Sequence, residues 1–481
     1  MAFPKITSFK SAADFQAHLE NLPIKMPFHA DVESGQSSPL AQSFETTCGT
    51  VGNRFSILPM EGWDGTTDGL PTDLTIRRWR RFGESGAKLI WGGEAVAVSP
   101  EGRANPNQLM INSSTLSSIE SLRKTLIDAH AEACETTSDL KVGLQLTHSG
   151  RFARPNKKEV IEPTIAYAHP ILDARFKIAD SAAVTITDDG LKELIEKFVS
   201  AAKMAEGLGF DFVDVKQCHG YFGHELLSGY DRPGEFGGSF ENRTRFIREV
   251  IAGIQAETKL AIGSRISIFD FAPFTKADDA VGISQSDGPY EHAFGGDGTG
   301  EGIDLQEPAE FLKLMADVGV KMICTTAGSP YYNPHIQRPA TAPPSDGYLP
   351  PEDPLVGVAR QIKATAELKS KLPDSIFVGS GYSYLQDWLP NVGQGVVADQ
   401  MADSIGLGRM VLSYPDLPLD VIAGNKLQRK KICRTFSDCT TAPRNGIVSG
   451  CYPLDKFYKD MPERKELVQI KKDAIPKASG A

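Results

Sequence analysis

The sequence predicts a single α/β domain built as a (β/α)8 barrel of the TIM type. Eight short apolar runs, typical of buried strands, alternate with segments whose apolar residues recur at helical spacing. The predicted strands are 54–60, 88–92, 142–147, 210–216, 260–267, 320–325, 375–379 and 404–408, and the predicted helices include 74–85, 116–133, 191–206, 241–256, 308–318 and 355–368. Such alternation forms a parallel sheet through right-handed crossovers, and eight strands close a barrel. An open doubly wound sheet would need a glycine-rich dinucleotide motif after its first strand, whereas Pro59-Met-Glu-Gly-Trp63 stands there.

The segments that flank the predicted barrel differ from it in character. We expect an N-terminal arm at 1–50, the barrel at 51–425 and a C-terminal extension at 426–481. Within the barrel, the Asp- and Gly-rich connection 270–304 and the Pro-rich connection 328–354 are long. Loops of this length in a compact domain are usually lids or binding loops. The alternative is that they are surface insertions or oligomer contacts.

Composition and charge exclude several classes of protein. With 41% hydrophobic and 23% charged residues, the chain has the make-up of an ordinary globular protein. Its net charge of -10 argues against a nucleic-acid partner, which usually requires a basic face. No apolar run suits a signal peptide or the ~20 residues of a membrane span. The seven Cys form no disulfide framework, so we expect a cytoplasmic protein that contacts no membrane.

The predicted chemical centre follows the fourth predicted strand. The segment Val213-Asp-Val-Lys-Gln-Cys-His-Gly-Tyr221 is an apolar run that ends in Lys216, His219 and Tyr221, and a glycine-rich loop at 231–243 follows it. Polar side chains that appear at the C-terminal end of a barrel strand usually face the ligand. These three residues are therefore the candidate catalytic groups.

Other strand ends carry residues suited to a phosphate and a ring. Gly379 and Gly381 follow the seventh predicted strand, and Gly408 and Arg409 follow the eighth, where barrels commonly bind phosphate through backbone N–H groups. Arginine can also grip phosphate oxygens with two hydrogen bonds. In the third and fifth strands, Gln145 and Arg265 offer donors and an acceptor that match a heterocycle with imide edges. Alternatively, they bond to each other or to loop carbonyls.

Together these motifs resemble the Old Yellow Enzyme superfamily of FMN-dependent oxidoreductases, and within it the branch of 2,4-dienoyl-CoA reductase and trimethylamine dehydrogenase. They extend from about residue 52 to residue 455. The resemblance implies that FMN is bound by Pro59, Met60, Glu61, Ala95, Gln145, Arg265, Gly379, Gly381, Gly408 and Arg409. A cation such as Arg265 beside the flavin would stabilise its reduced, anionic form.

The resemblance also implies a reaction and its rivals. We expect a two-step cycle in which NAD(P)H reduces FMN and an activated C=C bond is then reduced, as in ene-reductases. Lys216 and His219 would polarise the substrate carbonyl, and Tyr221 would supply the proton. The runner-up is an amine or C–N dehydrogenase or demethylase, with an aromatic cage drawn from Trp63, Tyr331 and Tyr332. Further rivals are a flavin subunit of an electron-transfer complex and a non-flavin barrel that binds a phosphorylated substrate.

Two residues in the candidate site depart from the family pattern. Many relatives have His where Lys216 stands, and many have Thr or Cys where Glu61 stands. Lys216 therefore binds an anionic substrate group, polarises a carbonyl, or pairs with a loop carboxylate. An ionised Glu61 near the flavin would disfavour its reduced form, whereas a protonated Glu61 could donate a hydrogen bond to it. The third alternative is that Glu61 turns away and pairs with an Arg.

The C-terminal extension is a further departure. Relatives in this branch bind a [4Fe–4S] cluster with four Cys, whereas Cys433, Cys439 and Cys451 remain here and Phe436 stands at about the place of the fourth. We therefore expect the cluster to be lost and the thiols to be packing residues of a relic loop. A cluster held by three Cys and another ligand is the alternative.

The resemblance also bears on the electron donor and on assembly. Relatives continue into flavodoxin-like and nucleotide-binding domains, whereas only about 30 residues follow the last Cys here. Electrons are then expected from NAD(P)H bound over FMN or from a separate redox partner protein. Because family members are often dimers or tetramers, a homo-oligomer is expected as well.

Overall fold

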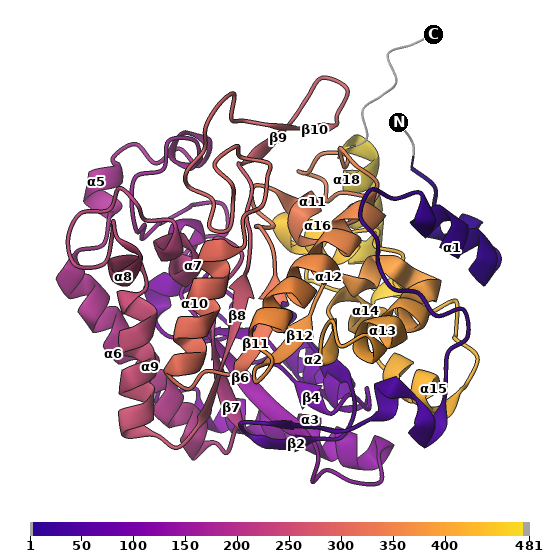
Figure 1. Ribbon diagram of the computed structural model, residues 1–481. Helices are drawn as coiled ribbons and strands as arrows, with labels where there is room; N and C mark the ends of the chain where they lie inside the picture. Colours follow the sequence, from indigo (N-terminus) through magenta and orange to yellow (C-terminus); the bar gives the residue numbers. More distant parts are fainter. Residues whose placement is uncertain (1–2, 475–481) are drawn as a thin grey trace.

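The computed structural model describes residues 3–474 and contains a closed barrel of eight parallel strands (Figure 1). In order around the barrel the strands are β4 (Leu89–Ile90), β3 (Phe55–Ile57), β13 (Ser404–Leu407), β12 (Ile376–Gly379), β11 (Met322–Thr326), β8 (Ala261–Ser267), β7 (Phe212–Val215) and β6 (Lys141–Thr147). Pairing between β4 and β6 closes the ring. Each predicted strand overlaps one of these eight, so the predicted (β/α)8 fold is confirmed.

The six predicted helices are present around the barrel. The longer helices are α2 (Asp73–Gly83), α3 (Leu116–Ala133), α6 (Asp188–Gly207), α9 (Arg245–Glu257), α10 (Gln306–Asp317), α12 (Pro354–Lys371) and α13 (Leu389–Ala398). Shorter ones are α4 (Leu172–Arg175), α5 (Ser181–Val184), α7 (Phe222–Leu227), α8 (Phe240–Arg243), α11 (Pro334–Gln337) and α14 (Arg409–Ser413). Helix α13 was not predicted, because it is buried on most sides and contains two glycines. A Cβ on Gly395 would lie 2.9 Å from Pro27, so close packing against the N-terminal arm explains that glycine.

The N-terminal arm contains more regular structure than the sequence indicated. Helix α1 (Ala12–Glu20) lies in the predicted amphipathic segment and stacks Phe15 on Trp388 at 5.3 Å. A hairpin that was not predicted, β1 (Phe44–Thr46) and β2 (Gly49–Val51), packs Phe44 and Val51 on the apolar side chains at the N-terminal ends of the barrel strands. The hairpin therefore covers the end of the barrel opposite to the candidate site (Figure 1).

The long loops and the C-terminal extension gather at the C-terminal end of the strands. The first long loop contains the hairpin β9 (Phe274–Lys276) and β10 (Gly282–Ser284), and β5 (Ala95–Ala97) extends the second strand beside β6. Helix α15 (Leu417–Ala423) ends the barrel segment, and the extension folds into α16 (Asp438–Arg444), α17 (Lys456–Lys459) and α18 (Glu463–Ala474). Helices α11, α16 and α18 lie at the top of the molecule in Figure 1. The division into arm, barrel and extension remains a proposal.

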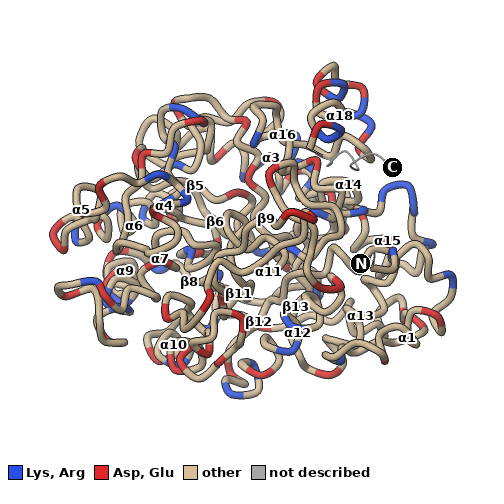
Figure 2. The backbone as a smooth tube through the Cα atoms, turned by 90° about the horizontal axis from the view of Figure 1, so that it is seen from above, with Lys and Arg blue, Asp and Glu red and all other residues tan. Residues whose placement is uncertain are grey.

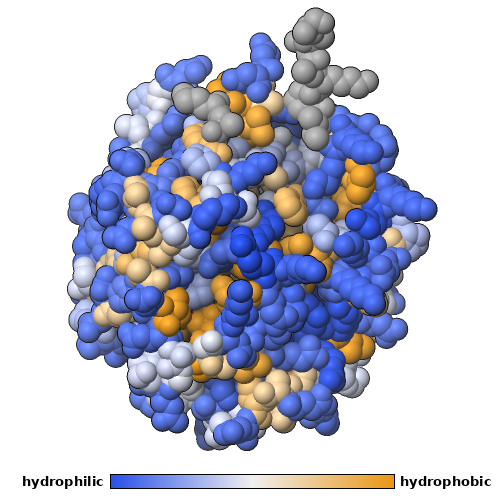
Figure 3. All heavy atoms as spheres, turned by 90° about the vertical axis from the view of Figure 1, so that its right-hand side faces the viewer, coloured by the Kyte–Doolittle hydropathy of each residue, from blue (hydrophilic) through white to orange (hydrophobic). Residues whose placement is uncertain are grey.

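The surface has mixed charge. Seen from above, Lys and Arg are interspersed with Asp and Glu around the outside of the barrel (Figure 2). The face beside α1 and α13 is mainly hydrophilic, with scattered hydrophobic residues (Figure 3). Among residues 3–474, no helix has both the length and the apolar character needed to cross a membrane.

Candidate active site

A cavity of about 220 Å³ opens at the C-terminal end of the barrel strands. Its lining includes eleven of the residues singled out in the sequence, namely Pro59, Met60, Glu61, Gln145, Lys216, His219, Tyr221, Arg265, Gly381, Gly408 and Arg409. Ala95 and Gly379 are outside the lining: Ala95 accepts a bond from Gln108 at 2.9 Å, and a Cβ on Gly379 would lie 2.3 Å from the Tyr382 hydroxyl. Parallel strands end at one rim, which brings these side chains together.

A buried carboxylate that sequence reasoning missed fixes the floor of the cavity. Asp214 in β7 accepts hydrogen bonds from Trp91 Nε1 at 2.8 Å, Gln145 Nε2 at 2.5 Å and the Arg265 backbone N–H at 2.7 Å. Burial raises the pKa of Asp214 to about 6. Gln145 therefore bonds to Asp214 and keeps its amide oxygen for another partner. The only available signal was a single carboxylate inside an apolar strand.

Three arginines, which we call the arginine region (Arg265, Arg338 and Arg409), line the cavity with incompletely bonded guanidinium groups. Arg265 Nε, Arg338 Nη2 and Arg409 Nη1 are buried and have no hydrogen-bond partner within residues 3–474. Burial, then Arg444 and Arg409, lowers the pKa of Arg338 to about 9. Buried cations of this kind are costly without an anion. The region is thus suited to an anionic ligand.

The predicted catalytic groups are tightly packed. Lys216 Nζ lies 3.0 Å from Glu61 Oε1 and 3.8 Å from the centre of the Tyr221 ring. The Tyr221 hydroxyl is 2.9 Å from that of Tyr331. We call Glu61, Lys216 and Tyr221 the paired region. Burial, followed by Glu61 and Tyr331, raises the pKa of Tyr221 well above its ordinary value, so this phenol keeps its proton.

His219 is held by its backbone as well as its ring. Its φ of 68° lies in the left-handed region, its N–H donates to Ser267 Oγ at 3.0 Å, and its carbonyl accepts from Ser329 Oγ at 2.7 Å. The ring nitrogen Nε2 is 3.2 Å from Gln337 Nε2. Burial, then Arg265 and Lys216, lowers the pKa of His219 well below its ordinary value. His219 is therefore a neutral hydrogen-bonding group.

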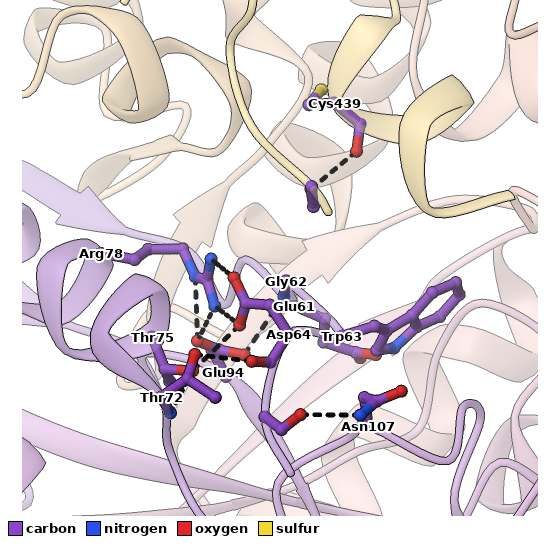
Figure 4. Close-up of polar contacts among 12 residues, drawn as sticks. Glu61, Gly62, Trp63, Asp64, Thr72, Thr75, Arg78, Glu94, Asn107 and Cys439 are labelled. Atoms are coloured by element: carbon purple, nitrogen blue, oxygen red, sulfur yellow. Dashed lines mark hydrogen bonds and ion pairs between the residues drawn. The ribbon is translucent and has the colours of Figure 1, made fainter. Parts of the chain in front are cut away.

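An ionic network beneath Glu61 anchors its loop (Figure 4). Arg78 donates to Asp64 at 2.7 Å and to Glu94 Oε1 at 2.6 Å, and the Gly62 N–H donates to Glu94 Oε2 at 3.2 Å. Trp63, with φ 49°, donates from Nε1 to Glu61 Oε2 at 2.8 Å. Burial raises the pKa of Glu94 to about 7, against the opposing effect of Arg78. The sequence did not reveal this network.

Of the three aromatic residues proposed for a cage, Trp63 and Tyr331 line the cavity. Tyr332 is bonded elsewhere, since its hydroxyl donates to the buried Asp270 at 2.5 Å. Tyr331 stacks on Phe152 at 4.1 Å, which fixes its ring. Trp63 and Tyr331 therefore form an aromatic wall of the cavity, and Tyr332, the third residue proposed for the cage, is not part of it.

The three thiols of the C-terminal extension line a separate cavity of about 20 Å³ together with Phe436. A space of this size matches one water molecule. Burial raises the pKa of the Cys433 thiol to about 11, which disfavours the thiolate that iron requires. Within residues 3–474 no group of His, Cys, Asp or Glu is arranged to hold a metal ion. The geometry does not fit a four-iron cluster, and loss of the cluster stays a prediction.

Comparison with known proteins identifies the family. Residues 44–284 match the model of the NADH:flavin oxidoreductase / NADH oxidase family. The chain belongs to this family. It is an FMN-dependent oxidoreductase of the Old Yellow Enzyme superfamily, as the motifs predicted, and the narrower branch stays a prediction.

Individual relatives are distant. An NADPH dehydrogenase from Bacillus velezensis is 29% identical over 285 residues, 58% of this chain and 70% of the relative. A 2-naphthoyl-CoA reductase complex matches with TM-score 0.64 and 18% identity over 91% of this chain, which spans only 58% of that enzyme. An Old Yellow Enzyme homologue from Zymomonas mobilis matches with TM-score 0.56 and 20% identity, over 81% of this chain and 94% of that one. These solved structures show the fold.

Proposed function

We propose that the protein uses NAD(P)H to reduce an activated C=C bond conjugated to a carbonyl group. The observation that supports this most is the single cavity in which the arginine region adjoins the proton-bearing Tyr221 and the Lys216 ammonium. A redox cofactor with an anionic tail suits the first group, and a carbonyl substrate suits the second.

The residues of the cavity fit FMN. The Arg409 and Arg338 nitrogens that have no partner among residues 3–474 suit the phosphate, beside Gly381 and Gly408, where a side chain is absent. Arg265 and the free amide oxygen of Gln145 suit the edge of the flavin ring, with Pro59 and Met60 against it. Ala95 and Gly379 remain candidates for backbone contacts only. When bound, the flavin would supply hydride transfer between the nicotinamide and the substrate.

The protein's own groups would position and protonate the substrate. Lys216 would donate to the carbonyl oxygen, because its ammonium has three N–H donors and Glu61 takes one. Neutral His219 would orient the same oxygen. The Tyr221 O–H would give its proton to the carbon that does not receive the hydride, and Tyr331, bonded to it, would return a proton from solvent.

The first test is the visible spectrum of the purified protein, followed by anaerobic addition of NADH and then NADPH. We expect flavin bands that bleach with at least one nucleotide and recover when 2-cyclohexenone is added. Flavin that stays oxidised with both nucleotides, or that recovers with oxygen but with no enone, would contradict the proposal.

Amine oxidation is the second candidate, because a carboxylate and three aromatic rings, those of Trp63, Tyr221 and Tyr331, line the cavity. Glu61, Trp63 and Tyr331 are suited to a cationic amine. However, the Lys216 ammonium already occupies the face of Tyr221 and neutralises Glu61. Reduction of the flavin by alkylamines in the absence of nicotinamide would favour this candidate. A subunit that depends on a redox partner protein would show neither reaction alone.

Assembly and location belong to the same proposal. We expect a cytoplasmic homo-oligomer that acts on a small molecule, as the family resemblance implied. Sedimentation of the purified protein would test the assembly, and fractionation of the source cells would test the location.

A further inference from the structure

The two departures from the family pattern contact each other. Lys216 and Glu61 are 155 positions apart in the sequence, yet Nζ and Oε1 lie 3.0 Å apart. Their side chains are 3% and 15% exposed, so both charges are largely removed from water. Two buried charges this close are neutral as a unit, and each explains the presence of the other.

The pair is held from both sides. Glu61 Oε2 accepts from Trp63 Nε1 at 2.8 Å, and the next residue, Gly62, is anchored to Glu94. Lys216 follows β7, its N–H donates to the Leu146 carbonyl at 3.2 Å, and its ammonium lies over the Tyr221 ring. A ligand therefore meets a preformed ion pair rather than a free ammonium.

The other titratable groups beside the ion pair contribute no negative charge. Among the described residues that line the cavity, Glu61 is the sole carboxylate. His219 is neutral, and Tyr221 and Tyr331 keep their protons because burial raises the pKa of both phenols. Without Glu61, the paired region would be cationic and would attract carboxylates and phenolates.

We propose that Glu61 determines substrate charge: it makes the paired region accept a neutral carbonyl and reject a free carboxylate. A neutral carbonyl oxygen takes one of the remaining Lys216 N–H donors. The second oxygen of a carboxylate would instead face Glu61, and like charges repel strongly in a partly desolvated site. The substrates would then be enones, imides, esters or thioesters rather than unsaturated acids. This inference rests on the proposed function, since it takes the paired region as the substrate site.

The test uses two ligands of the same shape, benzamide and benzoate, titrated into the FMN-loaded protein and followed by the flavin spectrum. Wild type should bind benzamide and bind benzoate more weakly. Glu61→Gln should tighten benzoate binding by about tenfold or more while changing benzamide binding less than about threefold. Glu61→Asp, which keeps the charge, should leave the order of the two ligands unchanged.

A second readout does not depend on ligands. The midpoint potential of bound FMN should rise in Glu61→Gln, fall in Lys216→Met and return close to wild type in the double variant, because the charges cancel. Shifts of one sign in both single variants, equal benzoate affinity in wild type and Glu61→Gln, or no binding of benzamide to wild type would overturn the inference. Failure of enone reduction with the expected ligand order would overturn the proposed function alone.

Discussion

In the arginine region, guanidinium nitrogens of Arg265, Arg338 and Arg409 are buried without partners among residues 3–474, whereas in the paired region Lys216 is neutralised by Glu61. Both regions line one cavity, so the difference is not a matter of solvent access. A protein tolerates unpaired buried cations where a ligand brings the counter-charge. It neutralises a cation internally where the ligand is uncharged. We therefore expect the anionic cofactor in the arginine region and, as proposed above, a neutral substrate in the paired region.

The largest change in the rate of enone reduction is expected from a substitution in the paired region. Tyr221→Phe removes the proposed proton donor and should lower the rate of enone reduction about 10³-fold, the typical contribution of a positioned acid. Reduction of the flavin by NADPH, which needs no proton from Tyr221, should stay within about twofold. Stopped-flow measurement of the two half-reactions checks this. Tyr332→Phe is the matched control, because that hydroxyl donates to Asp270 away from the cavity, and it should leave both half-reactions close to wild type. Equal losses in both half-reactions of Tyr221→Phe would contradict the assignment.

Substitutions in the arginine region should weaken FMN binding rather than slow enone reduction. Arg409→Ala should weaken FMN binding by about a hundredfold, because truncating one partner of a buried charge pair costs about 2–5 kcal/mol. Fluorescence quenching of FMN measures the dissociation constant. Arg444→Ala is the matched control, since the Arg444 guanidinium is already paired with Asp346 at 2.5 Å. If both variants lose FMN equally, the distinction between free and paired arginines fails.

A smaller loss of FMN affinity is expected when Asp214, which joins Gln145 to Arg265 at the floor of the cavity, is replaced. Asp214→Asn replaces an acceptor of three donors with a group that presents its own N–H₂, so Gln145 loses its fixed position. We expect about tenfold weaker FMN binding, from the same quenching titration.

Asp270→Asn provides the control for that change. Asp270 is also buried, and its pKa is likewise raised to about 6 by burial, but its partners are Tyr332 and Asn333. FMN affinity should be unchanged in this variant. A loss equal to that of Asp214→Asn would mean that any buried carboxylate of the barrel affects FMN binding.

Much of the arginine region was predictable because parallel strands end at one rim. Gln145, Arg265 and Arg409 follow or end apolar runs, so the sequence places them together once a barrel is assumed. Arg338 was missed because it lies in a proline-rich connection without periodicity. Asp214 was missed because its strand was interpreted as purely apolar.

The paired region was less predictable for a physical reason. Lys216 was expected at its strand end, and pairing with a loop carboxylate was among its alternatives, but the identity of that carboxylate depends on the path of the loop after β3. That path is set by Arg78 and Glu94, whose contacts are long-range. Contacts between residues so far apart in the sequence cannot be predicted from local sequence patterns. Pairing of Glu61 with an Arg was one of the alternatives left open, and Glu61 pairs with Lys216 instead, because Arg78 is taken by Asp64 and Glu94.

The support beneath the paired region offers the smallest and most specific test. Burial raises the pKa of Glu94 from 4.5 to about 7, so the folded protein binds this proton more tightly than the unfolded chain. The stability it contributes is complete below about pH 4.5 and is lost as the pH rises through about 7. Glu94→Gln mimics the protonated form and should match wild type at low pH.

Its melting temperature should therefore exceed that of wild type increasingly between pH 5 and pH 8, by on the order of 1–2 °C at the upper end. Differential scanning fluorimetry across this range measures the difference. Glu84→Gln, which changes a partly exposed carboxylate paired with Arg80 just after α2, should show no such trend. A constant offset for Glu94→Gln would mean that Arg78 keeps Glu94 ionised throughout. Glu61 would then be held above a permanently charged network rather than one that is neutralised in weak acid.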